Sequence, residues 1–294
     1  MRTLRYDRHD QEWDKALNDQ DFSRVADTWM REDNLDHWCH ARIRSAVRPF
    51  VESNTEASWL TVGDGRYGAD AHYLISLGAK AVHASDMHDT LLRIGSDRGF
   101  ITDYSAQNAE KMSFADESFD YVYCKEAFHH FPRPYIALHE MFRIARTAVI
   151  LTEPRDEVFH HAWVKRLAKL ALGKSERGHS FEPVGNYVYT VSERELEKFL
   201  LGMHYEHIAF SGCNNFYIEG VEFVPNEGGS SKDKRIRLMT KAAIMAMNAL
   251  EKVGLHRSSL LSAALFKQDP PEGLRDRLKS ADWTLRRLPK NPYL

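Results

Sequence analysis

The stretch Val62-Gly63-Asp64-Gly65-Arg66-Tyr67-Gly68 constrains the fold most, because it separates a strand pattern from a helix pattern. An apolar run over residues 58–62 precedes it, a helical pattern through Leu77 follows, and a second apolar run ends at Asp86. Strand, turn, helix and strand in this order predict one βαβ unit. Glycine in such a turn lets the backbone bend sharply and approach a ligand without a Cβ in the way.

Similar alternation continues along the chain. Further strands are expected over 100–107, 119–128, 147–154 and 204–210, with helices over 132–146 and 192–203. Thr190 or Ser192 could cap the second of these helices. For the last strand, 214–224 and 260–268 both qualify, and we favour 260–268 with an inserted helix over 234–253 before it. Strands that alternate with helices predict an α/β fold with a parallel sheet covered on both faces.

Three regions follow from this pattern. Residues 1–56 carry apolar positions at helical intervals and are expected to form an N-terminal helical cap. Residues 57–268 are expected to form the α/β domain, with a lid insertion over 157–189 and a second insertion over 212–257. Residues 269–294 are expected to be a surface tail.

The distribution of charge and the cysteine content indicate which binding partners and which cellular compartment to expect. The formal net charge is −2, but residues 232–294 hold 14 Lys and Arg against 6 Asp and Glu, whereas the rest holds 26 against 36. We expect the basic part to pack on the acidic body or on a second subunit rather than on nucleic acid. Three scattered cysteines predict no disulfide framework. With no signal-type or membrane-spanning apolar run, we expect a cytoplasmic protein.

Asp86 suggests what the glycine turn binds. It lies 21 residues after Gly65 at the end of the second strand, where a carboxylate can accept hydrogen bonds from ribose hydroxyls. The pattern therefore predicts a cofactor that contains adenosine. Taken alone it also suits a nicotinamide or flavin dinucleotide.

The segment from Gln107 to Asp120 (QNAEKMSFADESFD) resembles the class I S-adenosylmethionine-dependent methyltransferases, particularly the small-molecule group. The resemblance continues through CKEAFHHF at 124–131 to Glu153-Pro154, and it covers about residues 58–155. It implies a Rossmann-like, doubly wound sheet of seven mostly parallel strands with one reversed strand. It also implies S-adenosylmethionine as cofactor. The turn and the GNYVYT stretch look loosely like methyltransferases of bacterial polysaccharide biosynthesis.

The resemblance assigns residues to the cofactor. Position by position, these would be Gly63, Asp64, Gly65, Gly68, Asp86, Met87, Asn108, Ala109 and Lys125. Two residues depart from the family pattern. Thr61 stands where an acidic residue is usual, so the cofactor's amino group must be recognised from elsewhere. Asn108 replaces the usual Asp, although its amide oxygen can still accept a hydrogen bond from adenine.

Catalytic candidates follow the fourth strand. Methyl transfer requires the acceptor to be positioned and, for a hydroxyl, deprotonated, and the candidates for this are Glu126, His129 and His130. Glu153 at the end of the fifth strand has the character of an ordering carboxylate. His160-His161, Cys124 and the pair His129-His130 lack the spacing of a familiar zinc module, so we expect no metal.

Aromatic and amide groups near the insertions are candidates for substrate binding. They are Tyr187, Tyr189, Asn214, Asn215 and Tyr217. The hypothesis is methyl transfer to a small polar acceptor, most simply at oxygen, with a sugar or nucleotide-sugar as one candidate. An NAD-dependent oxidoreductase and a non-catalytic cofactor-binding regulator stay open as alternatives. A homodimer is also left open.

Overall fold

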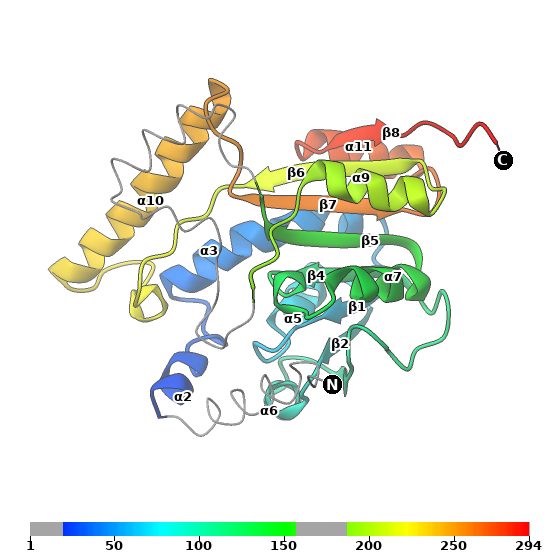
Figure 1. Ribbon diagram of the computed structural model, residues 1–294. Coiled ribbons are helices and arrows are strands. Elements are labelled where there is room, and N and C mark those ends of the chain that lie inside the picture. The colour runs from blue at the N-terminus through cyan, green and yellow to red at the C-terminus, as the bar shows by residue number, and fades with distance from the viewer. Residues whose placement is uncertain (1–19, 157–186, 294) are drawn as a thin grey trace.

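One eight-stranded sheet forms the centre of the computed structural model, which describes residues 20–156 and 187–293 (Figure 1). The strand order is β3-β2-β1-β4-β5-β7-β6-β8. The strands are β1 (Ser58–Val62), β2 (Ala81–Asp86), β3 (Asp103–Ala106), β4 (Phe119–Lys125), β5 (Ala145–Pro154), β6 (His207–Cys213), β7 (Leu260–Phe266) and β8 (Thr284–Arg287). The predicted βαβ unit is confirmed, because β1 ends at Val62 and β2 at Asp86 and the two are parallel.

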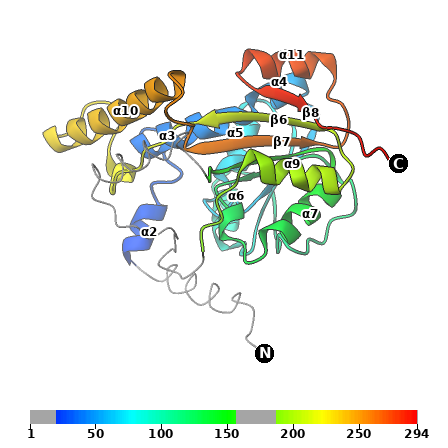
Figure 2. The same ribbon diagram turned by 45° about the horizontal axis from the view of Figure 1, so that its top comes forward.

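Helices cover both faces of the sheet, as the alternating pattern predicted (Figure 2). Helices α7 and α9 pack on one face, and α4, α5, α6 and α11 pack on the other. The helices are α2 (Gln20–Ala26), α3 (Leu35–Arg44), α4 (Arg48–Ser53), α5 (Ala69–Ser76), α6 (Thr90–Asp97), α7 (Pro134–Ile144), α9 (Glu193–Gly202), α10 (Ser231–Lys252) and α11 (Glu272–Ser280). Short 3-10 turns are η1 (Ser45–Val47), η2 (Phe128–His130) and η3 (Val221–Phe223).

The strand count corrects the seven-stranded prediction. The sheet has eight strands, and two of them are reversed, since β7 is antiparallel to β5 and β6 while β8 is antiparallel to β6. The eighth strand lies in the segment expected to be a surface tail. Leu274, Leu278 and Trp283 are buried there, and the Trp283 ring lies 5.5 Å from that of Phe50. Burial of these apolar side chains holds α11 and β8 on the body.

A long helix lies in the segment expected to be the second insertion. Two segments were candidates for the strand expected to be the last. Residues 260–266 form it, as β7, whereas residues 214–224 contain only the short turn η3. Helix α10 lies between β6 and β7 in sequence, and its first turn is capped by Ser230 and Asp233. Ser192 rather than Thr190 caps α9, where Glu195 completes a capping box.

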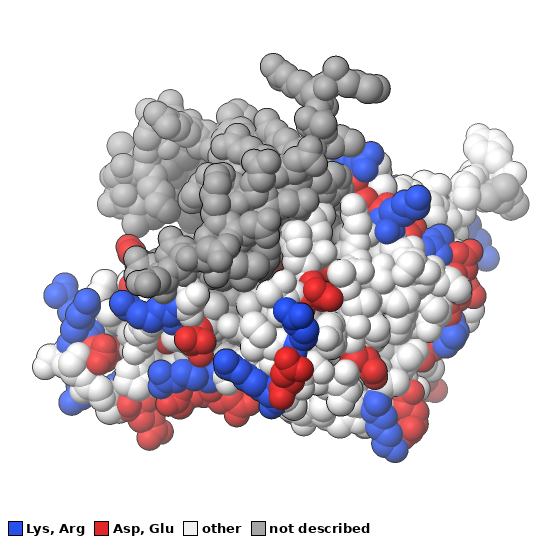
Figure 3. Space-filling model, turned by 90° about the horizontal axis from the view of Figure 1, so that it is seen from below, with Lys and Arg blue, Asp and Glu red and all other residues white. Residues whose placement is uncertain are grey.

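Basic side chains of the C-terminal part pair with acidic side chains of the body. Arg286 lies 2.6 Å from Glu193 and 3.0 Å from Glu197, and Lys267 lies 3.1 Å from Glu117. On the face drawn in Figure 3, acidic and basic side chains of the described part are interspersed. No helix among the described residues is both long and apolar enough to span a membrane.

Candidate active site

The glycine turn packs tightly against neighbouring strand ends. Gly63 has φ +76°, and a Cβ there would come within 2.3 Å of the Cβ of Ala127. A Cβ on Gly65 would lie 3.1 Å from Oδ2 of Asp86. Gly68, also at φ +76°, begins α5 and packs against Ile101. Gly65 therefore lets the turn lie beside Asp86 and Gly63 lets it pack against Ala127 after β4, whereas Gly68 serves the packing of α5.

Asp64 turns inward under α5. Its carboxylate accepts hydrogen bonds from the backbone N–H groups of Asp70 (3.0 Å) and Ala71 (2.9 Å) and from the Thr61 hydroxyl (2.9 Å). Burial and the nearby charge of Asp70 raise the pKa of Asp64 to about 7. A carboxylate therefore lies in direct contact with Thr61, three residues further along the chain.

Asp86 is a candidate for binding the ribose, and its carboxylate receives few hydrogen bonds from the protein. Its Oδ1 accepts a hydrogen bond from the backbone N–H of His88 at 3.2 Å, and burial raises its pKa to about 6. A carboxylate with so few donors is stabilised by hydroxyl groups that donate to it. Met87 follows directly, and Gln107 bonds through its N–H to the Asp86 carbonyl at 2.7 Å, which brings the segment of Asn108 and buried Ala109 alongside.

A cavity of about 330 Å³ opens beside the glycine turn. It lies at the carboxyl ends of β1 and β4, where an α/β sheet ordinarily binds its ligands. Its lining combines predicted residues with others from α3 and α5: Asp36, His40, Arg44, Gly63, Asp64, Arg66, Asp70, Lys125, Glu126, His129, His130, Asn215 and Tyr217. The cavity therefore brings together the three catalytic candidates, three of the cofactor candidates (Gly63, Asp64 and Lys125) and two of the substrate candidates (Asn215 and Tyr217), whereas Asp86 and the other cofactor candidates do not line it.

A chain of ion pairs forms one wall of this cavity. Buried Arg44 pairs with Asp70 at 2.6 Å, Lys125 lies 3.6 Å from Asp70 and 3.2 Å from Glu126, and His40 lies 3.4 Å from Glu126. Burial alone would raise the pKa of Glu126, but Lys125 and His40 hold it well below its usual range. A carboxylate so stabilised takes up a proton reluctantly, which weakens Glu126 as a base.

Sequence reasoning missed the residues that α3 contributes. Asp36, His40 and Arg44 lie four residues apart, so one face of the helix presents all three. Polar residues at intervals of four in an otherwise partly apolar helix were the sequence signal that could have identified them. Arg66 in the glycine turn was also missed, and its guanidinium contacts both Asp36 (3.2 Å) and His40 (2.8 Å).

His129 is held by Glu153 from the end of β5. Its Nδ1 donates to Oε2 of Glu153 at 2.6 Å, and Glu153 is fully buried. The other oxygen, Oε1, accepts from the backbone N–H groups of Ala127 and Phe128. Glu153 thus fixes both the loop and the imidazole orientation. The ring of His130 stands 4.0 Å from that of His129.

The substrate candidates divide into two groups. Tyr187 and Tyr189 have rings 5.1 Å apart, and the backbone N–H of Tyr189 bonds to the His129 carbonyl at 3.3 Å. Asn214 is buried and does not line the cavity. Its side-chain NH2 group donates hydrogen bonds to Asn248 and Glu251 of α10. Asn215 and Tyr217 line the cavity. Residues 157–186 of the expected lid lie outside the described part.

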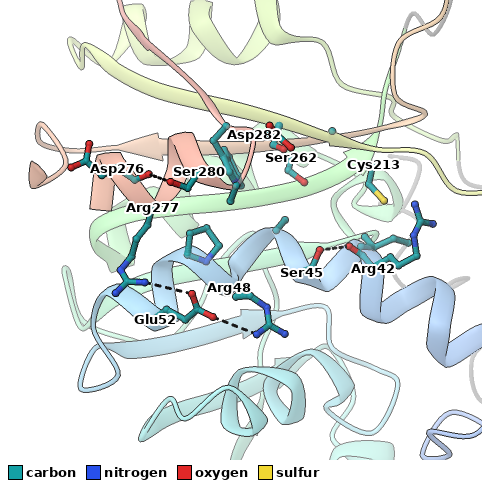
Figure 4. Close-up of a pocket in the computed structure, with 17 residues that line it drawn as sticks. Arg42, Ser45, Arg48, Glu52, Cys213, Ser262, Asp276, Arg277, Ser280 and Asp282 are labelled. Atoms are coloured by element: carbon teal, nitrogen blue, oxygen red, sulfur yellow. Dashed lines mark hydrogen bonds and ion pairs between the residues drawn. The ribbon is translucent and has the colours of Figure 1, made fainter. Parts of the chain in front are cut away.

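A second cavity, of about 700 Å³, lies between α3, α4 and the end of α11, over the ends of β6 and β7 (Figure 4). Arg48 and Arg277 flank Glu52 at its edge. None of the predicted site residues lines this cavity. Among the residues that the structure describes, no group of three or more His, Cys, Asp or Glu could hold a metal ion.

One family model matches part of the chain. Residues 60–151 match a family model described as a methyltransferase domain. No curated protein sequence matches the chain. The matched segment runs from β1 through β5, and it contains the glycine turn, Asp86 and His129.

Solved structures with a similar arrangement of elements include magnesium protoporphyrin IX methyltransferase from Synechocystis with bound S-adenosylhomocysteine. It is 13% identical, with 78% of this chain and 84% of that chain covered and a TM-score of 0.47. An S-adenosylmethionine-dependent methyltransferase from Methanosarcina mazei is 16% identical, with 72% and 92% covered and a TM-score of 0.44. The [4+2]-cyclase SpnF is 17% identical, with 78% and 81% covered and a TM-score of 0.44. Over residues 60–151, from β1 through β5, the chain is therefore similar to a methyltransferase domain.

Proposed function

We propose that this enzyme transfers a methyl group to a hydroxyl of a small polar acceptor. The observation that carries the proposal is the contact between His129 and Glu153 at the wall of the 330 Å³ cavity. Because Nδ1 donates to Glu153, Nε2 is the nitrogen that carries the lone pair and can accept a proton. Bound S-adenosylmethionine supplies an electrophilic methyl group, which needs no further activation.

In this proposal the site residues have separate tasks. Gly63, Gly65 and Asp86 hold the ribose side of the cofactor, and Met87, Asn108 and Ala109 lie at its adenine. Asp64 takes the place of the acidic group that Thr61 lacks. Lys125 and Glu126 stay paired and orient the wall of the cavity, and His130 supports the ring of His129. His129 removes the acceptor's proton.

The cavity wall supports an acceptor with more than one hydroxyl. Oδ1 of Asn215 is buried, and nothing in residues 20–156 or 187–293 donates a hydrogen bond to it. A buried acceptor left without a donor is costly, so a ligand hydroxyl that donates there would be favoured. The exposed side chains of Tyr189 and Tyr217 add aromatic surface near the same site. A sugar or a nucleotide-linked sugar has this chemistry.

Turnover of radiolabelled S-adenosylmethionine with defined acceptors tests the proposal. The panel would contain free sugars, nucleotide-linked sugars and primary amines, and mass spectrometry would locate the methyl group. We expect a methyl ether on a hydroxylated acceptor and a large loss of rate in His129→Asn. Methylation of amines alone, or a rate unchanged in His129→Asn, would overturn the assignment.

A further inference from the structure

Helix α10 has an inner side that packs on the body. Thr240 and Ile244 are buried there, and Lys241 lies over the Trp38 ring of α3. Figures 1 and 2 show the helix at the margin of the molecule, set apart from the sheet beyond the end at which β6 finishes. The outer side of the helix is therefore turned away from the sheet.

That outer side carries large apolar side chains that solvent reaches. Leu238, Met245 and Val253 are 69%, 69% and 67% exposed, and Met239 and Leu250 are 48% and 42% exposed. At about 100° per residue, all five fall within less than half of the circumference, opposite the buried residues. Single apolar side chains on a surface are ordinary, but these five form a continuous apolar strip along one helix.

Basic side chains border this apolar strip. Lys234 and Lys252 fall along one edge and Lys232 along the other. Arg235 lies at the amino-terminal end of the strip. All four side chains are exposed, and none forms an ion pair with an acidic side chain of residues 20–156 or 187–293. They differ in this from Arg286, whose charge is used within the fold.

The two acidic residues of α10 lie on its inner side. The Asp233 carboxylate accepts hydrogen bonds from the backbone N–H and the hydroxyl of Ser230, both at 2.8 Å, and so caps the first turn. Glu251 accepts from the side-chain NH2 group of Asn214 at 2.7 Å and from the Ser258 hydroxyl. Because both carboxylates are engaged in the fold, the outer side of the helix presents only positive charge around its apolar strip.

We propose that the outer side of α10 docks on an anionic lipid surface, with the helix lying flat. The apolar strip enters the boundary between headgroups and acyl chains, and Lys232, Lys234 and Lys252 reach lipid phosphates from both edges. A lipid surface accepts a convex row of apolar side chains along the whole 22-residue helix, without a matching groove, and supplies anionic groups on both sides at once. The inference concerns where the protein works and does not depend on the acceptor proposed above.

Co-sedimentation with vesicles tests the surface. Vesicles that contain phosphatidylcholine and phosphatidylglycerol in equal amounts should bind the wild-type chain, whereas vesicles of phosphatidylcholine alone should not. Binding should weaken as salt rises from about 0.05 to about 0.5 M, because exposed charges are screened. Failure to bind the mixed vesicles, or equal binding to both kinds, would overturn the proposal.

Two variants separate the basic edge from the apolar strip. Lys234→Gln combined with Lys252→Gln should weaken binding to the mixed vesicles about 30-fold, at about fivefold for each charge near the lipid surface. Met245→Glu should reduce binding at least about tenfold, because it sets a carboxylate in the strip that enters the lipid. Binding that survives both changes would contradict the proposal.

Matched controls lie in the C-terminal segment, which Figures 1 and 2 show on the side of the molecule away from α10. Lys279→Gln combined with Lys290→Gln removes the same charge from exposed side chains. Tyr293→Glu introduces the same carboxylate at a side chain that is 93% exposed. Both should bind the mixed vesicles like the wild type, and circular dichroism should show all variants folded. Losses equal to those of the α10 variants would show that total charge, and not α10, governs binding.

A fluorophore tests whether the strip enters the lipid. Ala246→Cys labelled with nitrobenzoxadiazole should emit at shorter wavelength on mixed vesicles, after subtraction of the signal from the three native cysteines. Ser280→Cys, labelled in the same way on α11, should not shift. Emission that is unchanged at both positions would contradict the docking geometry. Binding to polyglutamate but not to the mixed vesicles, lost in the lysine variant, would assign the helix to an acidic protein and overturn the proposal.

Discussion

His129 and Glu153 are the residues on which the proposed chemistry depends most directly. They come from the ends of adjacent strands, and their 2.6 Å contact leaves Glu153 with two further backbone donors. Glu153 therefore acts on the acceptor only through the histidine. It is a positioning residue, and its effect should appear in the rate and pH profile of the reaction rather than in cofactor affinity.

Glu153→Gln should separate the positioning of His129 from the support that Glu153 gives to the loop after β4. Glutamine keeps an oxygen for the N–H groups of Ala127 and Phe128, but its NH2 group cannot accept from Nδ1 of His129. We expect kcat to fall about 10² to 10⁴-fold, in the range attributed to general base catalysis, with little change in affinity for S-adenosylhomocysteine. His139→Asn on α7 is the matched control and should keep full activity. Equal losses of kcat and cofactor affinity would indicate a structural role only.

Asp86 should make cofactor binding depend on pH. Its pKa of about 6 means that the carboxylate is ionised above pH 6 and protonated below. The ionised form accepts hydrogen bonds from ribose hydroxyls, so affinity for S-adenosylhomocysteine should fall about tenfold per pH unit below 6. Calorimetry between pH 5 and 8 measures this. Asp86→Asn should bind S-adenosylhomocysteine weakly, and its affinity should not change with pH in this range. A wild-type protein whose affinity does not fall below pH 6 would contradict the assignment.

At the scale of helices and strands, the sequence predicted those features that depend on residues close together in the chain. The glycine turn with its flanking strands, and the choice of 260–268 over 214–224 as a strand, depend on short apolar runs and turn residues. The wall of ion pairs could not be predicted in the same way. Arg44 pairs with Asp70 and His40 with Glu126 only because the fold brings α3 over the strand ends.

The cap of α9 offers a test at this scale. Thr190 and Ser192 were equivalent candidates in sequence, and the structure gives the capping box to Ser192 while the Thr190 hydroxyl bonds to Asp156. Ser192→Ala should lower the free energy of unfolding by about 1 kcal/mol in urea. Thr190→Ala, at an exposed hydrogen bond, should change it by less than about 0.5 kcal/mol. A larger loss of unfolding free energy in Thr190→Ala than in Ser192→Ala would place the cap at Thr190.

For the whole molecule, the C-terminal segment is part of the folded body. The sequence suggested a tail because residues 269–294 are polar overall and basic. Only long-range packing reveals that Leu274, Leu278 and Trp283 complete the core against α4. The same segment contributes Arg286 to the ion pairs with α9, so the charge asymmetry of the sequence is largely resolved within one chain.

Removing Trp283 should therefore destabilise the protein. Trp283→Ala should reduce the free energy of unfolding by about 3 to 5 kcal/mol, as expected when a large buried aromatic side chain is deleted. Tyr293→Ala, at an exposed site in the same segment, should change it by less than about 0.5 kcal/mol. Equal, small effects in urea denaturation would show that the segment does not contribute to the core.

Isothermal titration calorimetry with S-adenosylhomocysteine and with NAD tests the central claim most directly. We predict one S-adenosylhomocysteine bound per chain, no heat with NAD, and at least about tenfold weaker binding in Asp86→Ala. Asp89→Asn, three residues along and exposed, should bind like the wild type. Binding of NAD without S-adenosylhomocysteine, or binding that Asp86→Ala leaves intact, would contradict the account.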